Sequence, residues 1–145
     1  MESEKYFIYI QDRLREINNY LTYRPRVKTP LGIGTIIIDQ NCYRIEYDNG
    51  KLENLVKSLR FWQDDFKLIV RELSDLTKEI THNGETFVPI EKLSEKCRMQ
   101  HELFELQNTI DLKALDYLKL LQWHFDIHGL IERNLAVNLN DLPNE

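Results

Sequence analysis

A run of short β-strand patterns between residues 26 and 56 constrains the fold more than any other feature of the sequence. Thr35–Ile38 is rich in β-branched residues, which fit the pleated and half-buried surface of a sheet. In Cys42–Tyr47 two tyrosines and an isoleucine alternate with charged residues, so this segment predicts a strand with one apolar face. Asp48–Gly50 follows with the residues of a tight turn.

Three further segments extend this strand pattern. They are short, and they are bounded by proline, glycine or polar residues: Val27–Thr29, Leu52–Val56 and Phe66–Val70. Short strands joined by tight turns indicate a small curled antiparallel sheet over residues 26–71, in the form of an SH3-like barrel or a meander.

The N-terminal residues 3–21 predict a helix, with Ser3 as its cap. Pro25 follows its end and restricts Arg24 to extended geometry. Apolar residues recur there at steps of three and four and form one stripe: Phe7, Ile10, Leu14, Ile17 and Leu21. The stripe can pack on its own domain or form an interface with a partner or a second copy. Because a coiled coil requires three to four heptads, packing within the domain is favoured.

Residues 74–145 predict a mainly helical part with a short extended tail. Helices are expected after Ser74 or Asp75, after Pro89, and from Asp111 to about Arg133. Asn134 is expected to take the left-handed conformation that ends a helix. The sequence therefore predicts one α+β domain over residues 1–145, with the sheet flanked by an N-terminal helix and a C-terminal helical part.

Composition limits the classes of function. The 145 residues carry a formal net charge of −5 and a sequence pI near 5.4, which argues against a dedicated nucleic-acid binder and against docking on an anionic membrane. The two cysteines, Cys42 and Cys97, lie far apart and predict reduced thiols. The sequence shows neither a secretory signal nor a transmembrane-length apolar run, so a cytoplasmic protein is expected.

A local basic cluster is the first candidate site. Arg24, Arg26 and Lys28 lie beside Tyr20 and Tyr23, and basic residues interleaved with aromatic ones can bind phosphates and stack on bases. The alternative is that these side chains flank a strand and pair with acidic residues elsewhere. The negative net charge favours the alternative.

A histidine pair is the second candidate site. On a helix, His124 and His128 would share a face, and Glu132 would lie one turn further along as a third metal ligand. Asp126 would point away from them, and the apolar neighbours favour a packed helix over a metal site. The sequence has no G-x-S-x-G elbow and no glycine-rich phosphate loop, so no cofactor and no enzymatic activity are expected.

Several stretches resemble a family of small uncharacterised proteins encoded by phages and prophages of Bacteroides-type bacteria. The resemblance lies in Leu73–Ile80 with His82–Ile90, in Trp123–Glu132 with Leu135–Ala136, and more weakly in Tyr20–Tyr23. Arg71 and Glu72 depart from the pattern, because a proline is expected there. The resemblance implies a mobile-element origin and an accessory role, and it transfers no activity and no site residue.

These observations lead to one expected function and one alternative. The expected function is that of a non-enzymatic accessory protein that binds a protein partner, as a monomer or homodimer. The alternative is a nucleic-acid-binding small-barrel module that uses the Arg24–Lys28 region. An enzyme that uses His124 and His128 ranks third.

Overall fold

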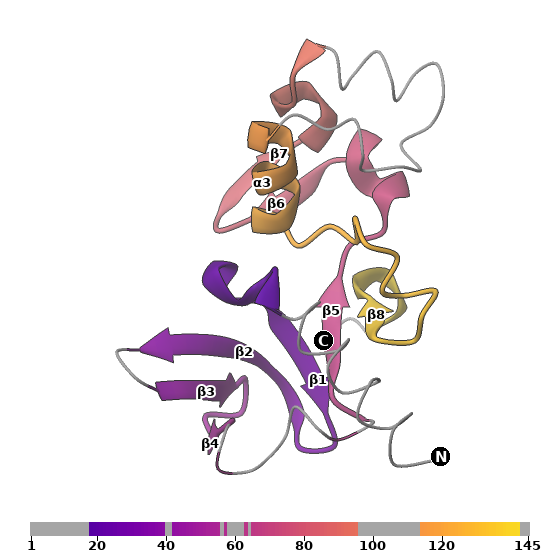
Figure 1. The fold of residues 1–145 in the computed structure, drawn as a ribbon. Coiled ribbons are helices and arrows are strands. Elements are labelled where there is room, and N and C mark those ends of the chain that lie inside the picture. Colours follow the sequence, from indigo (N-terminus) through magenta and orange to yellow (C-terminus); the bar gives the residue numbers. More distant parts are fainter. Residues whose placement is uncertain are drawn as a thin grey trace.

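An open six-stranded mixed sheet forms the larger part of the protein (Figure 1). The computed structural model describes residues 18–39, 42–55, 57, 63, 65–95 and 114–142. The sheet has the order β4-β3-β2-β1-β5-β8, in which β8 pairs with β5 in parallel and all other pairs are antiparallel. Its strands are β1 (Arg26–Thr29), β2 (Gly32–Asp39), β3 (Cys42–Tyr47), β4 (Leu52–Asn54), β5 (Lys67–Val70) and β8 (Ala136–Asn138).

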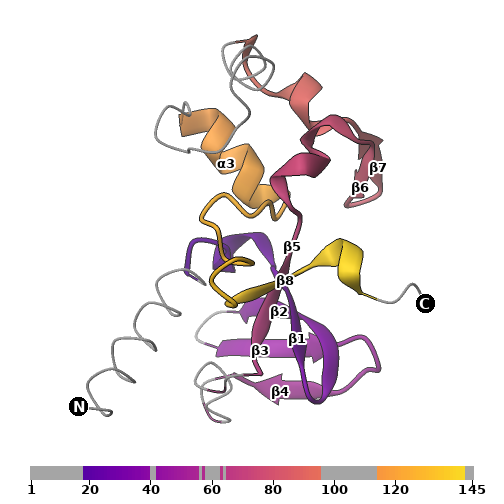
Figure 2. The ribbon, with the colours of Figure 1, turned by 90° about the vertical axis from the view of Figure 1, so that its right-hand side faces the viewer.

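A helix and a hairpin lie together beyond the end of β5 in both ribbon views (Figures 1 and 2). This helix–hairpin part consists of β6 (Ile80–His82), β7 (Glu85–Phe87) and α3 (Ala114–Gln122). Short 3₁₀ turns connect the elements: η1 (Leu21–Tyr23), η3 (Leu73–Thr77), η4 (Pro89–Lys92) and η6 (Leu139–Asp141). None of the helices in the described ranges has the length and apolar character needed to cross a lipid bilayer.

The predicted fold class is wrong, although the predicted early strands are present. The sheet is not a closed barrel, because β4 and β8 stay at opposite ends of the strand order. It is also not purely antiparallel, because Ala136–Asn138, predicted as an extended tail, adds the parallel strand. The N-terminal helix is not seen: residues 3–17 of the predicted span lie outside the described residues, and Leu21 belongs to a 3₁₀ turn.

The C-terminal helical part is also a correction, since α3 is the one α-helix that the described ranges contain in full. The helix predicted up to Arg133 ends at Gln122. The Phe125 N–H donates to the Leu120 carbonyl and the His124 N–H to the Leu121 carbonyl, both at 2.9 Å. This bond pair is a Schellman motif, which requires a left-handed residue, and His124 has φ 62°. Apolar spacing alone predicted a longer helix because the residues after His124 are also buried.

Backbone bonds after β5 connect the sheet to the segment that follows α3. The Arg71 N–H donates to the His124 carbonyl, and the Asp126 N–H donates to the Arg71 carbonyl, both at 2.8 Å. Arg71 and Phe125 thereby form an isolated parallel bridge. This bridge fixes the end of α3 against the end of β5, and both ends contribute to the site described below.

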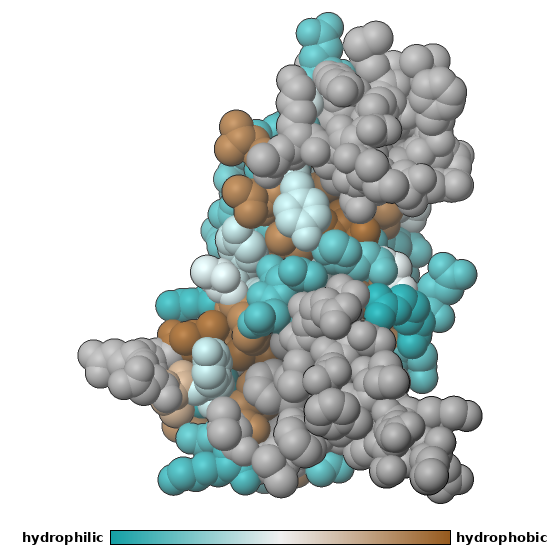
Figure 3. Space-filling view, in the orientation of Figure 1, coloured by the Kyte–Doolittle hydropathy of each residue, from teal (hydrophilic) through white to brown (hydrophobic). Residues whose placement is uncertain are grey.

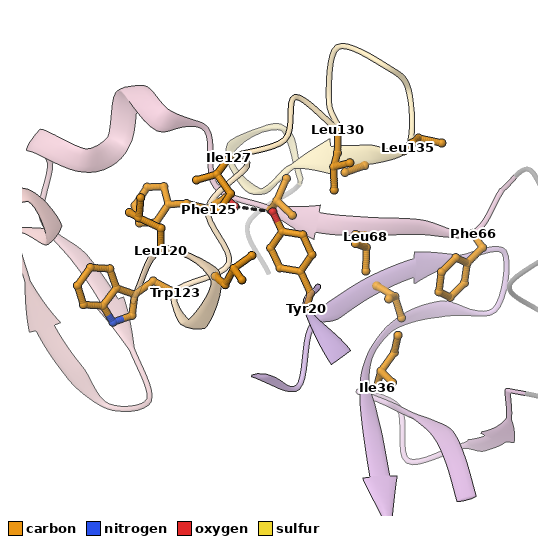
Figure 4. Packing of buried hydrophobic residues seen from close by; sticks show 14 of the residues in the cluster. Tyr20, Ile36, Phe66, Leu68, Leu120, Trp123, Phe125, Ile127, Leu130 and Leu135 are labelled. Atoms are coloured by element: carbon orange, nitrogen blue, oxygen red, sulfur yellow. Dashed lines mark hydrogen bonds between the residues drawn. The ribbon is translucent and has the colours of Figure 1, made fainter. Parts of the chain in front are cut away.

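One cluster of buried apolar side chains runs from the sheet to the helix–hairpin part. Tyr20 has no exposed surface and donates its hydroxyl to the Phe125 carbonyl at 2.6 Å. In Figure 4 its ring lies between Phe125 and Leu68, so it joins the two halves of the core. Burial of a ring of this size, with its hydroxyl satisfied, is a large stabilising contribution.

Strand register divides the sheet into two faces. Val27 pairs with Leu68, and Ile36 with Ile45; these four residues lie on the inner face, at most 1% exposed. The alternate positions form the outer face: Arg26, Lys28, Thr35 and Lys67, together with Ile69, which is covered and only 3% exposed. The sequence alternation that builds the core therefore places basic side chains together on the opposite surface.

Candidate anion-binding pocket

A pocket of about 540 Å³ lies where the outer face of the sheet meets the helix–hairpin part. Residues from η1, β1, β2, β6, the end of α3 and η6 line it, together with Arg71 directly after β5. The described side chains between these two parts of the molecule are mainly hydrophilic (Figure 3). The pocket is thus assembled from segments that are far apart in the sequence.

Three arginines give the pocket its positive charge. Five of the twelve residues that line it are arginine or histidine, and none of these twelve is aspartate or glutamate: the basic ones are Arg24, Arg26, Arg71, His82 and His124. This is notable in a chain with a net charge of −5. A concave surface with one sign of charge focuses the electrostatic field and attracts ligands of the opposite sign.

Arg26 projects from the outer face of β1 and is partly neutralised. Its guanidinium forms two bonds with Asp48, Nη1 to Oδ1 at 2.8 Å and Nη2 to Oδ2 at 2.6 Å. Nη1 also donates to Thr35 Oγ1 at 2.9 Å. Hydrogen bonding to Asp48 raises the pKa of Arg26, and the same bonds lower the pKa of Asp48. The pair fixes the orientation of Arg26 but offsets part of its charge.

Arg71 is held by neutral groups instead. Its Nε–H donates to the Trp123 carbonyl at 3.2 Å, and Nη2 donates to the Thr81 carbonyl at 3.1 Å. Burial lowers the pKa of Arg71, while the charge of Asp75 acts in the opposite direction. Within the described residues no carboxylate forms a salt bridge with Arg71. A guanidinium has five N–H donors, so about three remain for a ligand.

Burial disfavours the charged form of both histidines of the pocket. The His124 Nε2–H donates to the Tyr23 carbonyl at 2.7 Å. The pKa of His124 is lowered to about 4, mainly by burial; the bond to Tyr23 raises it, and the charges of His82, Arg71 and Arg26 contribute to lowering it. The His82 ring meets the His124 ring edge-on, with centroids 5.3 Å apart. Burial, and then the charge of Arg71, lowers the pKa of His82.

Unusual backbone conformations also gather at this pocket. Four non-glycine residues in the described chain have positive φ, and three of them line the pocket: Arg24 (50°), Asn83 (50°) and His124 (62°). The expected extended geometry of Arg24 is therefore wrong. Asparagine and histidine are enriched among left-handed non-glycine residues; Asn83 lies in the β6–β7 turn and His124 ends α3, so Arg24 is the least usual residue at such a position. The fourth such residue, Asn134, has the left-handed conformation predicted from the sequence.

The structure brings together most of the predicted nucleic-acid-binding set. Tyr23, Arg24 and Arg26 line the pocket, and Lys28 lies two positions along the same face of β1. Tyr20 is different, because its fully buried ring has no surface on which a base could stack. The basic cluster seen in the sequence is thus one wall of the pocket.

The predicted metal set is not brought together. Because α3 ends at Gln122, His124 and His128 do not share a helical face. His128 Nε2 is 2.8 Å from the Tyr117 hydroxyl, His124 bonds to Tyr23, and Glu132 is exposed. Across the described ranges no group of three His, Cys, Asp or Glu side chains is placed to hold a metal ion.

The predicted interface stripe can be placed only at its last residue. Leu21 is half-buried and packs against the core. Its other members, Phe7, Ile10, Leu14 and Ile17, lie outside the described residues.

Sequence reasoning missed Arg71 and His82. A local signal existed for Arg71, since Lys67, Ile69 and Arg71 alternate along one strand direction and place its side chain on the outer face. His82 lies just before the Asn83–Gly84 turn of the β6–β7 hairpin, and nothing local indicates that this turn lies beside the pocket.

Comparison with family models, curated proteins and solved structures gives no match for this chain.

Proposed function

We propose that the protein is a binding protein that holds a phosphate-bearing ligand of nucleotide size in this pocket. The observation that carries the proposal is the collection of three arginines, one of them paired with Asp48, around a cavity whose described lining has no carboxylate and includes two neutral histidines. Guanidinium groups match the geometry of phosphate oxygens and bind them through paired hydrogen bonds.

Arg71 is the central residue of the proposal. Its two carbonyl bonds hold the guanidinium in one orientation, and its charge is not offset by a contacting carboxylate in the described chain. Arg24 adds an exposed cation at the rim, held by a left-handed backbone. Hydrogen bonds to charged groups contribute roughly 1.5–3 kcal/mol each, so two such arginines can support specific anion binding.

The size and the remaining lining indicate more than an inorganic ion. Pockets for small molecules commonly measure roughly 300–1,000 Å³, and this pocket lies within that range. Tyr23 and His82 are half-buried residues of the lining, and aromatic rings are surfaces on which bases stack. Phosphate and base would then be recognised together. Binding without catalysis is proposed because the His124 Nε2–H already donates to a carbonyl.

The test is calorimetric titration with pyrophosphate, a nucleoside monophosphate and the matching nucleoside. We expect the phosphate-bearing ligands to bind and the nucleoside to bind at least tenfold more weakly, since one lost charged hydrogen bond corresponds to about that factor. Arg71→Gln should lower the affinity about tenfold or more, whereas Arg133→Gln, at an exposed arginine outside the pocket, should leave it unchanged.

A second variant shows whether weaker binding could result from misfolding. Arg24 is exposed and makes no hydrogen bond or ion pair with the rest of the described chain, so Arg24→Gln should fold normally and still weaken binding. If no phosphate-bearing ligand binds at millimolar concentration, or if both arginine variants bind as well as the wild type, the proposal is wrong.

Association through α3 is a second candidate, in line with the protein partner expected from the sequence. Leu115 and Leu118 lie three residues apart on this helix and are 72% and 45% exposed. Exposed apolar side chains at this spacing are typical of a helix that docks in a groove. Sedimentation velocity of the wild type and of a Leu115→Ser, Leu118→Ser variant tests a second copy as the partner. A monomer at all concentrations in both proteins would remove the homodimer.

A further inference from the structure

We propose that His82 makes the pocket selective for a phosphate monoester, because its ring takes up a proton when a doubly charged terminal phosphate binds beside Arg71. The proton comes from solvent and adds to a ring nitrogen, and no other bond is made or broken. A phosphodiester has only one negative charge to drive this uptake. This inference rests on the proposed function; it names the chemical class of the ligand and the residue that recognises it.

Arg71 joins the two segments that carry the histidines of the pocket. Its Nη2 donates at 3.1 Å to the carbonyl of Thr81, which directly precedes His82. Its Nε–H donates at 3.2 Å to the carbonyl of Trp123, which directly precedes His124. The two imidazole rings meet edge-on, with centroids 5.3 Å apart. One guanidinium and two imidazoles therefore converge in the pocket from the end of β5, from β6 and from the segment after α3.

The two histidines differ in what they can offer a ligand. The His124 Nε2–H already donates to the Tyr23 carbonyl. His82 is half-buried, and among the described residues its side chain has no hydrogen-bond or ion-pair partner. A neutral imidazole has one N–H donor, and a protonated imidazole has two. His82 is therefore the histidine with a free donor, and a proton gives it a second one.

The charged groups around the His82 ring disfavour a proton on it before a ligand binds. Those that line the pocket with it come from η1, β1, the end of β5 and the segment after α3, and all belong to basic residues: Arg24, Arg26, Arg71 and His124. Burial, and then the charge of Arg71, lowers the pKa of His82. A dianion against the ring would act in the opposite direction and favour the charged form.

The carboxylates near these groups lie outside the pocket lining. Each of them pairs with another cation: Glu85 with Lys92, Asp48 with Arg26, and Asp75 with Lys78. Glu85 is the cross-strand partner of His82, yet within the described chain the one charge that acts on the pKa of His82 is that of Arg71. The counter-charge for a protonated His82 is therefore left to an anionic ligand.

A phosphate monoester has the charge and the oxygens that this site requires. Its second pKa is about 6, so near pH 7 it carries close to two negative charges on three terminal oxygens. A diester has one charge and two free oxygens. Arg71 has about three unused N–H donors, and a protonated His82 adds its own, so all three oxygens of a terminal phosphate can be bound.

The experiment measures proton uptake together with affinity. Adenosine 5′-monophosphate and adenosine 3′,5′-cyclic monophosphate, which share base and sugar and differ in the phosphate ester, are titrated calorimetrically near pH 7. Titrations in phosphate-free buffers of different ionisation enthalpy give the number of protons taken up per ligand bound. The monoester should bind at least about tenfold more tightly than the cyclic diester. Its binding should take up roughly half a proton or more, and that of the cyclic diester almost none.

Two histidine variants test whether the proton goes to His82. His82→Gln should abolish the uptake and reduce the preference for the monoester several-fold, because glutamine donates a hydrogen bond but does not titrate. His128→Gln, at a histidine outside the pocket lining, is the matched control and should change neither quantity. Circular dichroism shows whether each variant is folded, and the wild-type titrations test the inference even if a variant is not.

The outcomes distinguish this inference from the proposed function. If adenosine 5′-monophosphate does not bind at millimolar concentration, the proposed function is wrong, and this inference with it. Monoester binding without proton uptake, equal affinity for the cyclic diester, or the same uptake in His82→Gln would overturn only this inference.

Discussion

The two faces of the sheet are built from the same strands, yet their side chains have different roles. On the inner face, Val27 and Leu68 form a cross-strand pair that is at most 1% exposed. On the outer face, at the adjacent position of each strand, Lys28 faces Lys67, whose Nζ donates to the Asn134 carbonyl. The inner pair contributes to the free energy of folding through burial, whereas Lys28 is exposed and adds little through burial. Substitutions on the inner face should therefore change stability, and substitutions on the outer face should change ligand binding.

The largest expected effect is a loss of stability on substitution of Tyr20, in the core beneath the inner face. Tyr20→Ala removes a fully buried ring and should lower the free energy of unfolding by about 3–5 kcal/mol, as measured by urea denaturation. Tyr20→Phe keeps the ring but removes one of the two donors to the Phe125 carbonyl, which still accepts from the Ile127 N–H, and should cost about 0.5–1.5 kcal/mol. A loss below 1 kcal/mol in the alanine variant would contradict the packing described for this ring.

The next effect concerns His124, which lies between the core and the pocket. Its folded-state pKa of about 4 is below its usual value of 6.5, so as pH falls the unfolded chain takes up the proton first. The associated stability is fully present above pH 6.5 and is lost as pH falls from 6.5 through 4. At 1.36 kcal/mol per pKa unit, the loss is about 3 kcal/mol. His82, whose pKa is also lowered, acts in the same direction.

Urea unfolding at several pH values between 7.5 and 4.5 measures this loss. The matched variant is His124→Asn, because asparagine tolerates the left-handed position that ends α3 and does not titrate. The difference in stability between wild type and variant isolates His124 from the carboxylates that titrate below it. A difference that stays constant across the range would show that His124 is not the buried neutral group described here.

Much of the early sheet could be predicted from the sequence because its information is local. Alternation in Cys42–Tyr47 and the Asp48–Gly50 turn determine strand, face and connection within a few residues. The parallel pairing of β5 with β8 could not be predicted in this way, since it joins segments from distant parts of the chain. Apolar spacing also could not show where α3 ends, because the residues that follow it are buried in non-helical form.

The same distinction explains what was predictable of the pocket. Arg24 and Arg26 form a wall that is contiguous in sequence, so a local basic cluster revealed it. Arg71 and His82 reach the pocket only through the bridge at Phe125 and the β6–β7 hairpin, which are long-range contacts. His124 was noticed for a different reason, its spacing from His128, and the structure places it in the pocket instead.

The smallest expected effect concerns Asp48, whose carboxylate offsets the charge of Arg26 on the outer face. The two side chains are 38% and 52% exposed, so Asp48→Asn should change stability by less than about 1 kcal/mol. Removing this charge leaves Arg26 available to a ligand, so titration with pyrophosphate should give a few-fold tighter binding, opposite in sign to Arg71→Gln. Asp65→Asn, at an exposed carboxylate outside the pocket lining, should have no effect. Weaker binding in Asp48→Asn would instead mean that the pair orients Arg26 for the ligand, and that Asp48 supports the site and does not compete with the anion.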